Sequence, residues 1–315
     1  MRRISHFAVQ KTFCGVRVGI FLGLAAAFNW GIADFAARFA TRRTGALRAL
    51  LFMQLTGFVA LTVGMAATGH WARFFPAFRW SVWAWIVLAG ILSALGALAL
   101  YRSFEIGMLA LVSPIASSYP ALTVVLAIST GERLTRAHAL GVTAVIIGVI
   151  IAAVALPAKD GASVGDAAVS ARDHRAHLLR GVPWALTAAL VFGVNYWILG
   201  FRVMPVFGGF ASVWVIRLVS FLLLALLLRP LGQRLEIPRG STAWLILFMG
   251  LTDTAGFVAN NFAFKQEEIA IATVLASLYG VVTLLFAAVF LRERLGRRQW
   301  AGVALIFAGV ALVSM

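Results

Sequence analysis

Two stretches of this chain, 160 residues apart, have nearly the same sequence. Residues 117–134 read SSYPALTVVLAISTGERL, and residues 277–295 read SLYGVVTLLFAAVFLRERL. Each stretch has a Ser, a Tyr and then a Thr four residues after the Tyr, and each ends its apolar run on Glu-Arg-Leu. Repetition at a fixed offset is the mark of an internally duplicated fold.

The duplication extends over most of the chain. At the same offset Gly96 and Phe104 match Gly256 and Phe264. A polar stretch rich in Gly, Ala and charges, residues 157–181, separates the two copies and has the composition of a linker. The sequence therefore predicts a first repeat at 1–156, a linker at 157–181 and a second repeat at 182–315.

Composition places both repeats in a membrane. Hydrophobic residues make up 62% of the chain and charged residues 12%, which is more apolar surface than one soluble core of this length can bury. A spanning helix needs about 20 largely apolar residues. Ten such segments are present, at 18–38, 46–67, 82–103, 109–128, 137–156, 182–202, 208–228, 243–264, 270–290 and 299–315. The predicted fold is an all-α polytopic membrane protein with ten transmembrane helices.

Five helices in each repeat have a topological consequence. After an odd number of spans the second copy enters the membrane from the opposite side, so the ten helices form two inverted five-helix repeats. Inverted repeats are typical of secondary transporters, whose substrate site lies between the halves near the bilayer midplane.

Several other classes do not fit. The net charge of +16 comes from Arg residues scattered over short connections, which is typical of membrane proteins and not of a nucleic-acid-binding face. The single Cys14 excludes an intramolecular disulfide and a multi-cysteine metal site. His174 and His177 lie in the linker without a cysteine or carboxylate constellation, so we expect solvated linker residues, no metal and no cofactor. Arg2 and Arg3 ahead of the first apolar run also fit a cleaved signal peptide.

The chain resembles the EamA-type carriers of the drug/metabolite transporter superfamily. The residues that carry the resemblance are Trp30-Gly31, Pro114 with Tyr119-Pro120 and Gly131-Glu132-Arg133-Leu134, and in the second copy Tyr279-Gly280 and Arg292-Glu293-Arg294-Leu295. The resemblance implies a multi-pass protein of the inner or plasma membrane that exports amino acids, drugs or other metabolites. Asp34 departs from the family pattern, in which this position is neutral.

Charged residues deep in a span are candidates for function because burying them in lipid is costly. Arg217 lies near the middle of the seventh predicted span and Asp253 near the middle of the eighth. Two interpretations are open: Arg217 binds a substrate carboxylate while Asp253 balances its charge, or the two form a structural ion pair. Asn260 shares a helical face with Asp253, and we expect that face to point inward.

Other candidate pathway residues come from position and symmetry. Asp34 lies one turn from the end of its predicted span, where it either contacts interfacial water or titrates as a proton carrier. Trp30 and Trp214 lie deep in their spans, and Trp214 shares a face with Arg217. Tyr119 and Tyr279 form a symmetric pair beside Pro120 and Gly280, where broken helices are expected to mark the transport site.

For each of the tyrosines and tryptophans, helix packing is the alternative to ligand contact. The two Glu-Arg-Leu motifs are expected at helix ends, where Glu132 and Glu293 pair with Arg or with backbone amides.

The predicted function is secondary, non-ATP transport of a small organic metabolite by alternating access, such as an amino acid or an amphipathic drug-like solute. No metalloprotease, hydrolase-elbow or phosphate-loop motif is present, so we expect no enzyme. A scaffold or receptor subunit, or a membrane-embedded enzyme, is the alternative. The expected partners are the solute and the lipid bilayer, with proton coupling as a candidate energy source; oligomeric state stays open.

Overall fold

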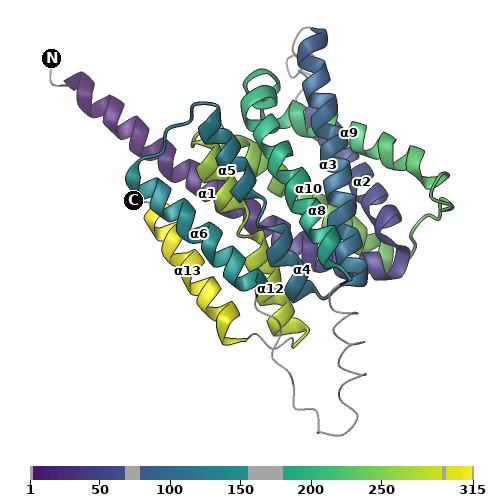
Figure 1. Ribbon diagram of the computed structural model, residues 1–315. Helices are drawn as coiled ribbons and strands as arrows, with labels where there is room; N and C mark the ends of the chain where they lie inside the picture. Colours follow the sequence, from purple (N-terminus) through teal and green to yellow (C-terminus); the bar gives the residue numbers. More distant parts are fainter. Residues whose placement is uncertain (1–2, 68–78, 155–179, 293–295, 314–315) are drawn as a thin grey trace, which may run out of the picture.

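The computed structural model describes residues 3–67, 79–154, 180–292 and 296–313, and the regular elements within these ranges are all helices (Figure 1). Nearly all of the predicted linker 157–181, with His174 and His177, lies outside the described residues, as does Glu293. The helices are α1 Arg3–Thr44, α2 Ala46–Ala67, α3 Trp80–Ile106, α4 Leu109–Ala116, α5 Pro120–Ser129, α6 Arg136–Val154, α8 Val182–Ile198, η2 Leu199–Val203, α9 Met204–Leu228, α10 Ser241–Ala263, α11 Ile269–Ala276, α12 Tyr279–Phe290 and α13 Arg297–Val313.

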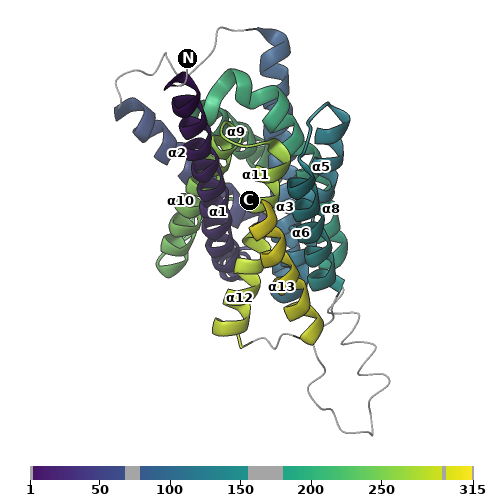
Figure 2. The ribbon, with the colours of Figure 1, turned by 90° about the vertical axis from the view of Figure 1, so that its left-hand side faces the viewer.

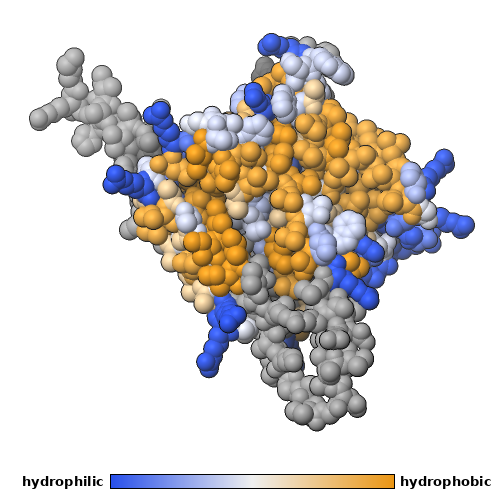
Figure 3. Space-filling view, viewed as in Figure 1, coloured by the Kyte–Doolittle hydropathy of each residue, from blue (hydrophilic) through white to orange (hydrophobic). Residues whose placement is uncertain are grey.

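Seven stretches of the described chain are long and apolar enough to cross a membrane. One of them, Val182–Leu228, is 47 residues long and contains α8, η2 and α9. Two shorter apolar helices, Arg136–Gly148 and Trp300–Gly309, add to these. Apolar side chains cover most of the surface in Figure 3, and charged side chains stand at its margins. The chain is thus a multi-pass membrane protein.

Two of the predicted spans are broken helices, as the sequence indicated. The first breaks at residues 117–119, between α4 and α5, and the second at residues 277–278, between α11 and α12. Pro120 begins α5 and cannot donate a backbone hydrogen bond to the helix before it. In each break a serine hydroxyl satisfies a freed carbonyl: Ser117 donates to Pro114 at 3.0 Å and Ser277 to Val274 at 2.7 Å.

The two breaks lie against each other in the centre of the molecule. A Cβ placed on Gly280 would lie 2.2 Å from the Ser117 hydroxyl, so only glycine fits at this crossing. The Tyr119 hydroxyl donates to the carbonyl of Thr273 at 3.4 Å. The rings of Tyr119 and Tyr279 stack with centroids 6.3 Å apart. The repeated motifs therefore meet each other rather than forming two separate sites.

The two halves exchange contacts in a symmetric way. The Thr123 hydroxyl on α5 donates to the Gly193 carbonyl on α8 at 2.9 Å, and the Thr283 hydroxyl on α12 donates to the Gly31 carbonyl on α1 at 3.3 Å. Each repeat thus bonds the first helix of the other. In the same manner α1 packs along α10, and α3 packs along α8.

The last helices of the two repeats, α6 and α13, form a close pair at the edge of the bundle (Figures 1 and 2). A Cβ on Gly148 would lie 2.8 Å from the Gly302 carbonyl oxygen, and one on Gly309 would lie 2.7 Å from the Gly141 carbonyl oxygen. Small residues allow two helix backbones to approach in lipid, where no hydrophobic effect drives them together. Gly148 on α6 and Gly309 on α13 have this role.

Candidate functional site

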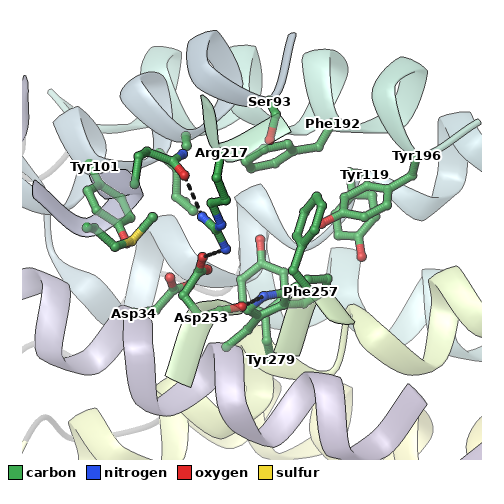
Figure 4. A pocket seen from close by; sticks show the side chains of 15 residues that line it. Asp34, Ser93, Tyr101, Tyr119, Phe192, Tyr196, Arg217, Asp253, Phe257 and Tyr279 are labelled. Atoms are coloured by element: carbon green, nitrogen blue, oxygen red, sulfur yellow. Dashed lines mark hydrogen bonds and ion pairs between the residues drawn. The ribbon is translucent and has the colours of Figure 1, made fainter. Parts of the chain in front are cut away.

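A small cavity lies where the two halves meet, lined by 15 residues (Figure 4). Its charged residues are Asp34 on α1, Arg217 on α9 and Asp253 on α10. The remaining walls are mainly aromatic. The other lining residues are Trp30, Met53, Gln54, Ser93, Ala97, Leu100, Tyr101, Tyr119, Phe192, Tyr196, Phe257 and Tyr279.

Arg217 and Asp253 form the ion pair that the sequence offered as one of two interpretations. Nη2 of Arg217 contacts Oδ2 of Asp253, and Nη1 donates to Oε1 of Gln54 at 2.6 Å. The arginine side chain is only 4% exposed, and the aspartate side chain 18%. The guanidinium plane also lies over the Phe257 ring, with Cζ 5.4 Å from its centroid. Two of the three guanidinium nitrogens are therefore already bound to protein groups.

Two glycines make room for these side chains. A Cβ on Gly57 of α2 would lie 2.2 Å from the Thr254 hydroxyl and 3.0 Å from Nε of Arg217. A Cβ on Gly256 of α10 would lie 2.8 Å from Trp30. The indole Nε1 of Trp30 can consequently donate to the Asp253 carbonyl at 3.2 Å, which ties α1 to the helix that carries the ion pair.

The position of Asp34 differs from the one that the sequence predicted, which was one turn from the end of its span. The first apolar stretch continues to Thr44, well beyond residue 38, so Asp34 is ten residues from the end of its helix rather than one turn. The residue is 5% exposed and lines the cavity. Within the described part of the chain, its Oδ2 atom is buried without a hydrogen-bond partner. A carboxyl oxygen in this position can accept a hydrogen bond from a ligand or carry a proton.

An aromatic wall faces these charges. Trp30 contacts Tyr196, Phe257 and Tyr279 with ring centroids 5.9–6.2 Å apart. Tyr119 stacks on Tyr196 at 4.8 Å. In Figure 4 Tyr119, Tyr196 and Phe192 lie on one side of Arg217, and Tyr101 and Asp34 lie on the other.

Two of the predicted pathway residues do not line the cavity. Trp214 donates its Nε1 to the Thr62 hydroxyl at 2.8 Å and packs on Phe58, away from the charges. Asn260 is fully buried on the inward face of α10, as expected, but is not among the lining residues. Conversely, Gln54 and Tyr196 line the cavity and were not predicted. Gln54 is the single glutamine of its predicted span, and an amide in an apolar helix is itself a signal of an interhelical bond.

The cavity has a volume of about 50 Å³. One water molecule needs roughly 10–15 Å³ of such space, so this conformation has room for a few waters and not for an organic metabolite. Binding of a solute requires the helices around the cavity to separate.

A second group of ionisable residues lies outside the spans, where α5 ends and α11 begins. Glu132 accepts a hydrogen bond from the Ala270 amide at 3.2 Å, and Nδ1 of His138 lies 3.3 Å from Oε2 of Glu268. Glu132 thus pairs with a backbone amide, as predicted, although that amide belongs to the other half. Burial raises the pKa of Glu132, and the hydrogen bond from Ala270 opposes the shift.

Neighbouring Glu267 is more strongly affected. Burial, together with the negative charge of Glu268, raises its pKa to about 7. A Cβ on Gly19 of α1 would lie 2.3 Å from Cγ of Glu267, so the acid packs directly on the first spanning helix.

Comparisons with known proteins agree with this architecture. A solved structure described only as "Crystal structure of protein" has a TM-score of 0.68 and 18% identity to this chain, and the match covers 93% of this chain and 95% of that chain. This likeness concerns the fold alone. A search of the curated protein sequences finds no match.

The family comparison is more informative, because it detects the repeat. The model described as "EamA-like transporter family" matches the chain twice, over residues 17–154 and again over residues 179–315. Two consecutive matches cover both halves that pack around the cavity. The chain therefore belongs to the EamA-like transporter family of membrane transporters.

Proposed function

We propose that this protein is a secondary carrier that moves a small organic metabolite across the inner or plasma membrane by alternating access. The observation that carries the proposal is the central cavity, which both halves line and which holds the buried carboxyl group of Asp34, whose Oδ2 has no hydrogen-bond partner among the described residues. Charged groups persist at such depth when they serve a pathway.

The proposal includes ten spans in two inverted repeats. The exchanged Thr123–Gly193 and Thr283–Gly31 hydrogen bonds support a two-fold relation between the halves. The 47-residue stretch Val182–Leu228 is long enough for two crossings, and each of the two short helices α6 and α13 supplies one more. In Figure 2 α1 and α13 run in opposite directions, as the first and last of an even number of spans should.

Within this proposal Trp30, Tyr119 and Tyr279 contact the solute, and the Arg217–Asp253 pair holds the helices around it. Asp34 exchanges protons and couples transport to the proton gradient. The broken helices α4–α5 and α11–α12 provide the flexible centre of the pathway, as discontinuous helices do in other carriers.

Uptake into proteoliposomes tests the proposal. Purified protein in liposomes with an imposed pH gradient should accumulate at least one member of a panel of small organic solutes, amines and amino acids among them, above the level of empty liposomes, without ATP. Asp34→Asn should abolish the response to the gradient, and the exposed variant Glu236→Gln should retain it. Absence of any gradient-dependent uptake over a broad solute panel would leave a scaffold, a receptor subunit or a membrane enzyme as the function.

A further inference from the structure

The charges in the central cavity do not balance. Of its 15 lining residues, two are carboxylic acids, Asp34 and Asp253, and one is a base, Arg217. Arg217 is engaged by Asp253 and Gln54. Since Asp34 is 5% exposed and its Oδ2 has no partner within the described residues, the cavity has a place for one more positive charge.

The walls around this place suit an organic cation. Seven of the lining residues are aromatic, and a cation is attracted to the faces of aromatic rings within about 6 Å. Phe257 already lies under the Arg217 guanidinium, but Trp30 and Tyr279 stand edge-to-face beside Asp34 with their centroids 6.2 Å apart. The Tyr279 hydroxyl also lacks a hydrogen-bond partner within the described residues and can accept one from an N–H group.

An anionic solute fits the site less well. It would have to displace Asp253 from Arg217 or approach two carboxyl groups with no spare cation, and unpaired buried charge is strongly disfavoured. A zwitterion would bring one charge of each sign and leave the imbalance as it was.

We propose that the site selects a protonated amine or other organic ammonium, whose nitrogen binds the Asp34 carboxylate and whose apolar part packs on Trp30 and Tyr279. The proposal rests on the proposed carrier function and names its substrate class. When the ammonium is absent, a proton occupies the Asp34 carboxyl. Binding of the cation then breaks that O–H bond and releases one proton to water, so cation and proton exclude each other.

Several groups face Asp34 and enter its titration. Asp253 on α10 acts on it with a like charge. Arg217 on α9, Tyr101 on α3 and Tyr279 on α12 line the same cavity. Among these, Arg217 is paired and the tyrosines are neutral, so the cation and the proton compete at Asp34 itself.

Calorimetry on the full-length protein in detergent tests the proposal without relying on transport. Three ligands share a phenyl ring and differ in charge: phenethylammonium, phenylalanine and 3-phenylpropionate. We expect phenethylammonium to bind at least roughly tenfold more tightly than the other two. Titrations in two buffers of different ionisation enthalpy should show close to one proton released per ammonium bound at a pH where Asp34 is protonated.

Variants separate the role of Asp34 from general damage. Asp34→Asn should weaken phenethylammonium binding by roughly tenfold or more and abolish proton release. Asp34→Glu should restore release, and Glu236→Gln should match the wild type. Thermal unfolding checks that each variant is folded.

The results distinguish this proposal from the carrier function. Tighter binding of 3-phenylpropionate or phenylalanine, or unchanged ammonium binding by folded Asp34→Asn, would overturn the substrate class even if uptake of other solutes is measured. Ammonium binding with proton release but no uptake in liposomes would instead overturn the carrier function and leave the cation site.

Discussion

The contact between Arg217 and Asp253 joins α9 to α10 inside the bilayer region, and Gln54 extends it to α2. The guanidinium cannot lose its proton, so it needs a counter-charge wherever it is buried. The aspartate is its partner, and removal of either residue leaves a charge whose burial is uncompensated.

Arg217→Gln should therefore lower the free energy of unfolding by about 3–5 kcal/mol. The double variant Arg217→Gln with Asp253→Asn should recover most of this loss, because two neutral amides replace the pair. Thermal unfolding of the single and double variants in detergent measures the coupling. Equal destabilisation in the single and double variants would mean that the pair does not hold the helices.

Glu267 gives the molecule a stability that depends on pH. Burial raises its pKa from the ordinary value of 4.5 to about 7 in the folded protein. Between about pH 4.5 and about pH 7 the folded state thus keeps a proton that the unfolded chain releases. The contribution of Glu267 to the free energy of unfolding is therefore fully present at acid pH and is lost as the pH rises through this range. Glu267→Gln should flatten this part of the pH profile of the unfolding temperature, whereas Glu236→Gln should leave the slope unchanged. A slope that persists in Glu267→Gln would assign it to another group.

The crossing of the two broken spans is among the closest contacts between helices. Gly280 lies against the Ser117 hydroxyl, and an added Cβ would approach it to 2.2 Å. Gly280→Ala should cost about 1–3 kcal/mol through overpacking. Ser117→Gly in the same chain should restore much of the loss, because it removes the hydroxyl that collides.

A matched control is available on α2. A Cβ on Gly64 meets no atom within 4 Å, so Gly64→Ala should be neutral or slightly stabilising by helix propensity. The unfolding temperatures of the three variants check the prediction. A neutral Gly280→Ala would show that the broken spans relax without resistance.

The helices also show what the sequence could predict. Apolar length placed α2, α3 and α9 within a few residues, and Pro120 with Gly280 located both breaks, because proline chemistry and close packing act locally. The depth of individual side chains in the membrane was harder to predict from the sequence. The end of α1 was missed because Arg38, Arg42 and Arg43 lower the apolar signal although the helix runs through them, and Asp34 was consequently placed too near the interface.

The residues that line the cavity could not be predicted from the sequence, because they are brought together by packing between helices. Spacing along α9 put Trp214 and Arg217 on one face, yet the indole turns to Thr62 and Phe58 while the guanidinium turns to Asp253. Tyr196 is on α8 of the second repeat, yet it stacks on Tyr119 of the first repeat. The packing of helices from the two halves against each other determines these side-chain contacts, and the spacing of residues within one helix does not.

In the whole molecule, the two repeats are interlaced rather than side by side. The first helix of each repeat bonds the other repeat through Thr123 and Thr283. Where α5 ends and α11 begins, His138 of the first half contacts Glu268 of the second, beside the Glu132–Ala270 hydrogen bond. A carrier that opens at this end must separate these groups.

A reversible crosslink between residues 138 and 268 should therefore stop transport. In a Cys14→Ser background, which removes the single native cysteine, His138→Cys with Glu268→Cys can be joined by a short disulfide-containing reagent. Uptake into proteoliposomes should fall to the level of empty liposomes on crosslinking and return on reduction, because the halves can then part again. Each single-cysteine variant, treated identically, should keep its own uptake rate. Full transport by the crosslinked protein would show that this end stays closed throughout the cycle, and that the solute enters and leaves by another route.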